Sequence, residues 1–169
     1  PLGEIIVVNL PGVTAALVEQ YRVDAEARKL GLTFTTASAD IQVRMDRTAY
    51  DLIASNLISN ALKYTLAGQV TVALEIRSEW AVLRVTDSGM GIPEKDIPRL
   101  FKEFFRASNA KSSGVPGTGV GLVGTKELVE RFGGYMEMQS REGQGSVFSV
   151  YLHRFGQSPA RTRNERAVT

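Results

Sequence analysis

Two amide side chains and one ammonium group are spaced so that they share one face of a single helix. Asn56, Asn60 and Lys63 lie four and three positions apart, and a helix of about 100° per residue gathers them within a sector of about 60°. Amide oxygens suit Mg²⁺, which prefers oxygen ligands, and the ammonium group can reach a phosphate as a point charge. Tyr64 follows directly and can pack against a sugar or a base. A solvated surface helix would carry the same residues, so this motif alone leaves both interpretations open.

An acidic residue at the end of a predicted strand opens a glycine turn. Asp87 follows the apolar run 81–85 and precedes Gly89 and Gly91. A carboxylate in this place can accept a hydrogen bond from the exocyclic amine of adenine, and the glycines allow positive φ and close approach of a base. An ordinary Asp-Ser-Gly turn is the alternative interpretation.

A second glycine motif opens a predicted helix. Backbone N–H groups at a helix start bind anions, and glycines let that backbone close on phosphates. Residues 119–124 also match the pattern G-x-G-x-x-G, but a dinucleotide fold requires a strand directly before it, and residues 111–116 indicate a loop. The candidate phosphate-binding residues are Gly117, Thr118, Gly119, Gly121 and Leu122.

Several helices must position these side chains. Asp46 is a suitable N-cap for a helix that runs to about Tyr64 and carries the two amides. Pro11-Gly12 should separate the first strand from a helix over residues 13–30. A helix over 118–132 should follow the second glycine motif, and one or two short helices are expected at 94–105.

The remaining periodic segments read as strands. The runs 32–36 and 41–45 are expected to pair with each other. This order of elements predicts one domain over residues 1–153, an α+β two-layer sandwich in which helices cover one face of a mixed, largely antiparallel sheet. The other expected strands are 4–10, 69–77, 80–86, 135–140 and 146–152.

Composition and charge exclude several classes of site. The chain has no cysteine, so disulfides, thiolate catalysis and cysteine-ligated zinc are excluded. The net charge is +2, but it comes from an arginine-rich segment, residues 154–169, which is expected to be a disordered tail. The body therefore has no basic face for nucleic acid. No apolar run approaches the roughly 20 residues of a membrane helix, so we expect a domain without membrane contact. We also expect the isolated domain to be monomeric and cytoplasmic, even if the parent protein is membrane-anchored.

The order and spacing of these motifs resemble the ATP-binding catalytic domain of sensor histidine kinases. This family lies in the GHKL superfamily, which also holds gyrase, Hsp90 and MutL ATPases, and the resemblance over residues 4–153 implies the Bergerat fold. Gly124 departs from the family, which usually has a larger apolar residue there, and Phe132 replaces a frequent histidine. The segments that match the family's boxes are 56–65 (N box), 87–91 (G1 box), 100–106 (F box), 117–122 (G2 box) and 143–146 (the last glycine turn).

The resemblance implies a role for each motif residue toward ATP and Mg²⁺. Asn60 would be the main Mg²⁺ ligand with Asn56 assisting, Lys63 would contact phosphate, and Asp87 would bind the adenine amine. Residues 106–116 would form the ATP lid. Further implied contacts are Tyr64 with ribose or adenine, Gly89 and Gly91 with the base, Gly117, Thr118, Gly119, Gly121 and Leu122 with the phosphates, Arg106 with the γ-phosphate, and Phe101 with Phe104 or Phe105 at the base of the lid.

One position distinguishes a phosphoryl donor from a hydrolase. The hydrolysing relatives carry a glutamate one helical turn before the Mg²⁺ asparagine, and that carboxylate activates water. Asn56 occupies this position here, and an amide cannot take a proton near neutral pH. The resemblance therefore implies a kinase, because phosphoryl transfer needs mainly positioning and charge neutralisation. A GHKL-type ATPase and a degenerate ATP-binding domain used for protein interaction are the alternatives.

The acceptor of the phosphoryl group is expected to lie outside this chain. His153 is the only histidine, and it lacks the acidic neighbour and the helical context of an acceptor. The resemblance implies a histidine on a separate dimerisation domain, followed by relay to a response regulator receiver domain. We therefore expect the chain to bind ATP with Mg²⁺ but to autophosphorylate negligibly alone.

Overall fold

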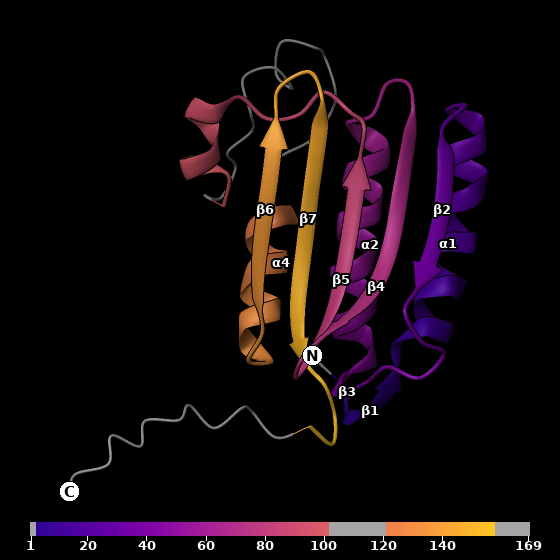
Figure 1. Cartoon of the computed structure of the whole chain (residues 1–169), viewed down its shortest axis with the longest axis vertical. Coiled ribbons are helices and arrows are strands. Elements are labelled where there is room, and N and C mark those ends of the chain that lie inside the picture. The colour runs from indigo at the N-terminus through magenta and orange to yellow at the C-terminus, as the bar shows by residue number, and fades with distance from the viewer. Residues whose placement is uncertain (1–2, 102–120, 158–169) are drawn as a thin grey trace, which may run out of the picture.

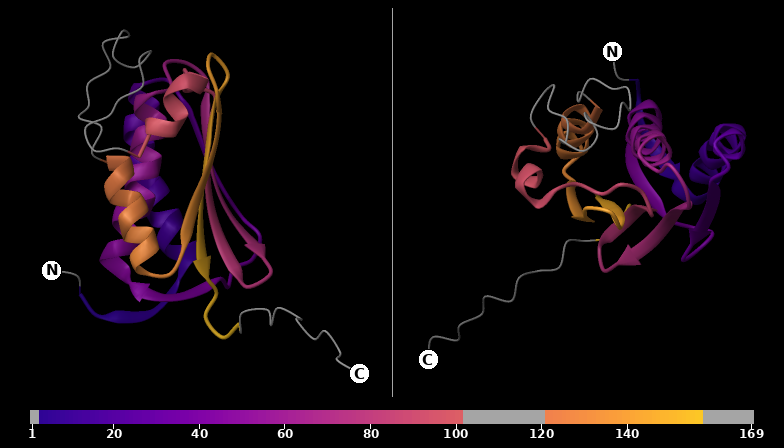
Figure 2. Two further views of the ribbon diagram at one scale, coloured as in Figure 1. Left: turned by 90° about the vertical axis from the view of Figure 1, so that its left-hand side faces the viewer. Right: turned by 90° about the horizontal axis from the view of Figure 1, so that it is seen from above.

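The structure, a computed structural model, describes residues 3–101 and 121–157. Five strands form one sheet in the order β2-β4-β5-β7-β6, and helices α1, α2 and α4 cover one face of it (Figures 1 and 2). This two-layer arrangement confirms the predicted α+β sandwich. The elements are β1 (Ile5–Asn9), α1 (Leu10–Ala27), β2 (Gly31–Thr36), β3 (Gln42–Asp46), α2 (Arg47–Lys63), β4 (Gln69–Arg77), β5 (Trp80–Asp87), the short 3₁₀ helix η1 (Glu94–Arg99), α4 (Gly121–Arg131), β6 (Tyr135–Arg141) and β7 (Gly145–His153).

The sheet is mixed, as predicted, but one predicted strand pair is wrong. β4, β5, β7 and β6 pair antiparallel in turn, whereas β2 pairs parallel with β4. The predicted partner of β2 was β3, which instead pairs antiparallel with β1 in a separate two-stranded ribbon. A parallel pair needs a long crossover between its strands, and β3 together with α2 provides that crossover between β2 and β4.

Helix α1 begins earlier than expected. Pro11 and Gly12 lie inside its first turn, and the helix starts at Leu10. Proline fits at the start of a helix because the first N–H groups have no partner within the helix. The strand does end before this dipeptide, as predicted, but the dipeptide lies at the beginning of the helix, so the predicted helix start at residue 13 was wrong.

Helix α2 lies at the centre of the helical layer. Asp46 caps it as predicted, because its Oδ1 accepts a hydrogen bond from the Ala49 N–H at 2.9 Å. The apolar side of α2 faces the sheet, and the side chains of both amides, Asn56 and Asn60, are half-buried. The buried residues of α2 are Ala49, Tyr50, Ile53, Ala54, Leu57, Ile58, Ala61 and Leu62.

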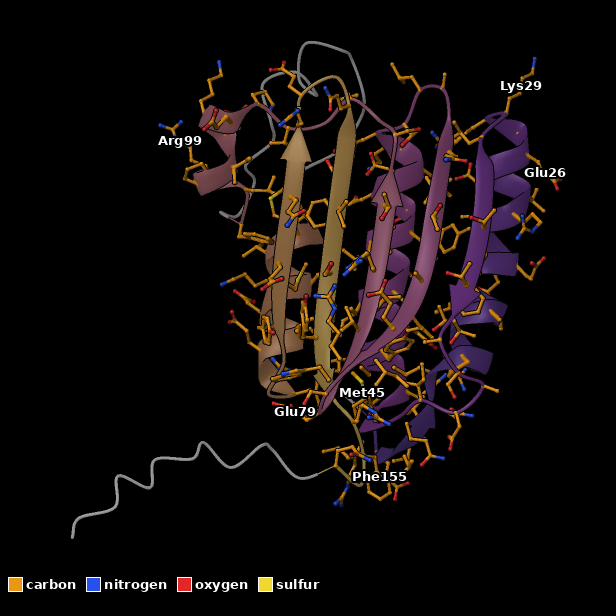
Figure 3. The ribbon with its side chains drawn as sticks, viewed as in Figure 1. Glu26, Lys29, Met45, Glu79, Arg99 and Phe155 are labelled. Atoms are coloured by element: carbon orange, nitrogen blue, oxygen red, sulfur yellow. The ribbon has the colours of Figure 1, made fainter. Side chains whose placement is uncertain are left out.

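The two ends of the sheet differ in what they carry. Arg99, on η1, lies at the end opposite Glu79 and Phe155 (Figure 3). At the Glu79 end, the Arg154 N–H donates to the Glu79 carbonyl at 2.8 Å, so the segment after β7 is tied to the body through its first residue. In the described ranges, no helix has the length and apolar character needed to cross a membrane.

Candidate functional site

The C-terminal end of α2 packs against the turn that follows β5. The Met90 N–H donates to the Tyr64 carbonyl at 3.1 Å. A Cβ atom on Gly89 would stand 2.9 Å from Thr65 Oγ1 and would also collide with the Tyr64 carbonyl, so only glycine fits there. The structure therefore brings the first glycine turn onto the helix that carries the amide side chains.

Asp87 ends β5 and is held by backbone donors. Its Oδ1 accepts a hydrogen bond from the Gly89 N–H at 2.9 Å, and the Ser146 N–H is a second donor. Burial raises the pKa of the Asp87 carboxyl above its ordinary value, and the two N–H groups lower that pKa only in part. The carboxylate is thus fixed in place at the half-buried rim of the turn.

The turn between β6 and β7 closes against the turn after β5. The Gly143 N–H donates to the Met90 carbonyl at 2.8 Å. Gly91 has a φ of 65° and Gly145 a φ of 121°, backbone angles that residues with a side chain rarely adopt. A Cβ atom on Gly145 would collide with the Asp87 carbonyl, so this glycine is what allows the two turns to meet.

Asn56 connects α2 to α4, the helix that the second glycine motif opens. The Asn56 Nδ2 donates to Thr125 Oγ1 at 3.0 Å, and the Thr125 hydroxyl donates to the Gly121 carbonyl at 2.7 Å. Thr125 is fully buried between the helices. The first residue of α4 is therefore linked through one hydroxyl group to the predicted metal ligand.

Asn60 and Lys63 follow Asn56 along α2, and both are half-buried. Among the described residues, none hydrogen-bonds to the Asn60 side chain. The Lys63 Nζ lies 5.9 Å from the centroid of the Tyr64 ring. With respect to the described residues, the Asn60 amide and the Lys63 ammonium group are therefore open to a ligand.

The chemistry of this donor set fits Mg²⁺. Within residues 3–101 and 121–157, no group of three or more His, Cys, Asp or Glu side chains could hold a metal ion. A cation on this face would therefore take neutral amide oxygens from the protein and the rest of its ligands from a bound anion and water. Such a set of ligands suits Mg²⁺, which prefers oxygen and keeps several waters.

The remaining predicted residues divide between described and undescribed positions. Gly121 is exposed at the start of α4, and Leu122 is partly buried against the core. Phe101 is half-buried, and the Lys126 Nζ lies 5.9 Å from its ring centroid. Arg106, Gly117, Thr118, Gly119, Phe104, Phe105 and the predicted lid at 106–116 lie outside the described residues.

His153 lies away from these groups. It is the last residue of β7, whereas Ser146 beside Asp87 is near the first. The His153 ring is exposed and lies 4.1 Å from the Trp80 ring, centroid to centroid. Its place at the far end of the strand agrees with the interpretation that it is not an acceptor for this site.

Sequence reasoning assigned no role to four hydroxyl groups around the site. Thr125 links α2 to α4, Thr65 Oγ1 donates to the Ala61 carbonyl at 2.7 Å, and Ser146 Oγ pairs with Ser140 Oγ at 2.7 Å. A polar residue on the inward face of a predicted helix is the signal that could have identified Thr125. Ser146 lies in the last glycine turn and Ser140 in the predicted strand before it, but nothing in the sequence indicated that their hydroxyl groups would pair.

Comparison with family models and curated proteins gives consistent matches. The family described as "Histidine kinase-, DNA gyrase B-, and HSP90-like ATPase" matches residues 45–155. The sensor histidine kinase WalK of Bacillus subtilis is 36% identical over 116 residues, which are 67% of this chain and 19% of that protein. The circadian input-output histidine kinase CikA of Synechocystis is 41% identical over 108 residues, 63% of this chain and 14% of that protein. The chain thus spans less than a fifth of the length of these relatives.

Solved structures show the same fold. The nucleotide-free catalytic domain of histidine kinase ThkA has a TM-score of 0.78 and 25% identity, with 90% of this chain and 97% of that chain covered. The mycobacterial sensor histidine kinase MprB has a TM-score of 0.75 and 25% identity, with 89% of this chain and 98% of that chain covered.

Proposed function

The chain belongs to the family of histidine kinase-, DNA gyrase B- and HSP90-like ATPases, as the ATP-binding domain of a sensor histidine kinase. From this premise we propose that it binds ATP with Mg²⁺ and donates the γ-phosphoryl group to a histidine on a separate dimerisation domain. The observation that supports this most is the meeting of three distant segments. Helix α2 contacts the first glycine turn through Tyr64 and contacts the helix of the second glycine motif through Asn56.

Each described motif residue has a proposed role that agrees with its position. Asn60 and Asn56 hold Mg²⁺ through their amide oxygens, Lys63 contacts phosphate, and Asp87 accepts from the adenine amine. Mg²⁺, when bound, neutralises charge on the phosphates. Tyr64 packs on ribose or adenine, and Gly89, Gly91, Gly121 and Leu122 place backbone or apolar surface against the nucleotide.

The contacts of Asn56 favour a kinase over a hydrolase. Its amide nitrogen is engaged by Thr125, and an amide has no lone pair basic enough to take a proton from water near neutral pH. Asn56 therefore supplies no general base. ATP would be kept intact until an acceptor side chain arrives.

The partners follow from this role. We propose a histidine-bearing dimerisation domain of the parent protein as the acceptor and a response regulator receiver domain as the next partner. The domain would act in the cytoplasm, where ATP is available. The relatives WalK and RcsC are named as sensor histidine kinases, and the matched residues cover only 19% and 14% of their lengths, which supports a parent protein longer than this chain.

Two measurements on the 169-residue chain test the proposal. Calorimetric titration with a non-hydrolysable ATP analogue should show binding that Mg²⁺ strengthens. Incubation with labelled ATP should give negligible phosphohistidine on the chain alone and clear labelling of an added dimerisation domain. An absence of nucleotide binding would favour the protein-interaction alternative. Steady hydrolysis of ATP to ADP without labelling of any histidine would favour the ATPase, provided that Asn60→Ala abolishes this hydrolysis.

A further inference from the structure

The contacts of the Thr125 hydroxyl group determine which acceptor receives its proton. It is fully buried and lies 2.7 Å from the Gly121 carbonyl, which can only accept a hydrogen bond. The single hydroxyl proton is therefore used on that carbonyl. Toward Asn56, Thr125 Oγ1 can only accept, so the group it faces at 3.0 Å must be the amide nitrogen of Asn56.

This direction also decides which way the Asn56 amide oxygen points. With the NH₂ group turned toward Thr125 on α4, Oδ1 lies in the same plane on the opposite side of Cγ and is directed away from Thr125. Among the residues that the structure describes, none donates a hydrogen bond to that oxygen. A flip of the amide would set two acceptor oxygens against each other in a buried place, which is unfavourable.

We propose that Thr125 is a positioning residue, which orients the Asn56 amide so that its oxygen is presented to Mg²⁺. The inference rests on the proposed function, in which Asn56 is a metal ligand. Groups that hydrogen-bond to metal ligands fix the orientation of those ligands, and their loss typically weakens metal binding by about 10- to 100-fold. Thr125 would act in this way from a different helix, and through Gly121 it ties the ligand to the start of α4.

A purely structural role for Thr125 predicts a different result. Threonine often donates to the carbonyl four residues earlier in a helix, and the bond to Gly121 has this spacing. If that were its whole purpose, loss of the hydroxyl would change stability and leave the effect of Mg²⁺ on nucleotide binding unchanged. The two roles are therefore distinguished by the metal dependence of affinity.

The test compares Thr125→Val, which keeps the shape and removes the hydroxyl, with Thr125→Ser, which keeps the hydroxyl. Calorimetry measures the affinity of a non-hydrolysable ATP analogue in Mg²⁺ and in EDTA, and the readout is the ratio of the two affinities. We expect this ratio to fall about 10-fold in Thr125→Val, with the affinity in EDTA unchanged. Thr125→Ser should keep most of the wild-type ratio.

Thr14→Val is the matched control. Thr14 is also fully buried, and its hydroxyl pairs with the Tyr50 hydroxyl at 2.6 Å, away from the amide side chains. This control loses a buried hydrogen bond and should lose stability while keeping the wild-type ratio. An equal fall of the ratio in Thr14→Val and Thr125→Val would overturn the proposal, as would a wild-type ratio in Thr125→Val.

A double-mutant cycle asks whether Thr125 acts through Asn56. In an Asn56→Ala background, Thr125→Val should cause no further fall of the ratio, because the oriented group is gone. A further fall as large as in the wild-type background would overturn the proposal. A wild-type chain that binds no analogue at all overturns the proposed function instead, so the two failures are distinguishable.

A measurement on the wild-type chain covers the case in which Thr125→Val does not fold. One of the two side-chain NH₂ protons of Asn56 is hydrogen-bonded to a buried hydroxyl, so that proton should exchange with deuterated water more slowly than the side-chain NH₂ protons of Asn60. Equal exchange rates for the two asparagines would show that the amide is not held, and the proposal would then be wrong.

Discussion

At the scale of single residues, Asp87 is where chemistry and position are most closely tied. Two backbone N–H groups hold its carboxylate, so the adenine amine would meet an acceptor that is already in place. The sequence made Asp87 a candidate for the adenine site because a predicted strand, an acidic residue and a glycine turn follow one another. It did not predict Thr125, whose role depends on a contact across 69 positions of the chain, which no local pattern reveals.

Asp87→Asn should weaken binding of ATP by about 10- to 100-fold, since a hydrogen bond to a charged acceptor is worth about 1.5–3 kcal/mol. The amide can still accept from the Gly89 N–H through its oxygen, so the fold should be retained. Calorimetry of ATP binding measures the loss, with exposed Asp40→Asn as the matched control. Wild-type affinity in Asp87→Asn would contradict the role of this carboxylate.

The raised pKa of Asp87 predicts how that loss depends on pH. Burial raises the pKa, so the carboxyl takes up its proton at a higher pH than an ordinary aspartate, which titrates near about 3.9. As pH falls through the raised pKa, wild-type Asp87 loses its charge and comes to resemble asparagine. The ratio of wild-type to Asp87→Asn affinity should therefore shrink as pH falls, and the protonation of ATP itself cancels in that ratio. A ratio that stays constant down to pH of about 4 would count against this explanation.

At the scale of elements, most local signals predicted the structure correctly, and the exception is Pro11-Gly12, which lies inside the first turn of α1. The Asp46 cap, the length of α2 and the two hairpins follow from capping, periodicity and glycine turns. The partner of β2 could not be read in this way. Pairing with β4 depends on how α2 crosses the sheet, and that is decided by burial of the whole helix.

The contact between α2 and the first glycine turn predicts the effect of Gly89→Ala. The added Cβ atom would collide with the Tyr64 carbonyl and would stand 2.8 Å from Asp87 Oδ1. The turn would have to move off the helix end, so we expect a loss of about 1–3 kcal/mol in the free energy of unfolding together with weaker nucleotide binding. Urea unfolding and calorimetry measure the two effects. An unchanged unfolding free energy would show that the turn does not need this close packing.

Gly124 provides the opposite case. It lies inside α4, it is exposed, and a Cβ atom there would meet no described atom within 4 Å. Close packing against the described residues is therefore not the reason for this departure from the family. Gly124→Ala should stabilise the protein by about 0.5–1 kcal/mol through helix propensity alone, which urea unfolding would detect. A destabilised variant would indicate that this position needs glycine for another reason.

At the scale of the whole molecule, the fold places the candidate site and His153 at opposite ends of the sheet. The Asp87 turn and the C-terminal end of α2 lie at one end of β5 (Figure 1). The rings of Trp80, Tyr151 and His153 contact one another at the other end of that strand. The order of motifs along the chain predicted that three segments would share a site. Their separation from His153 required the register of β7, in which Ser146 and His153 stand near opposite ends.

The central claim is that α2, the first glycine turn and the start of α4 form one nucleotide site. The most direct measurement is the change in backbone amide NMR shifts of the wild-type chain on addition of Mg²⁺ and a non-hydrolysable ATP analogue. The largest changes among the described residues should fall at 56–64, at 87–91 and at the beginning of α4. Changes confined to the open face of the sheet, or to one of these three segments alone, would contradict the claim.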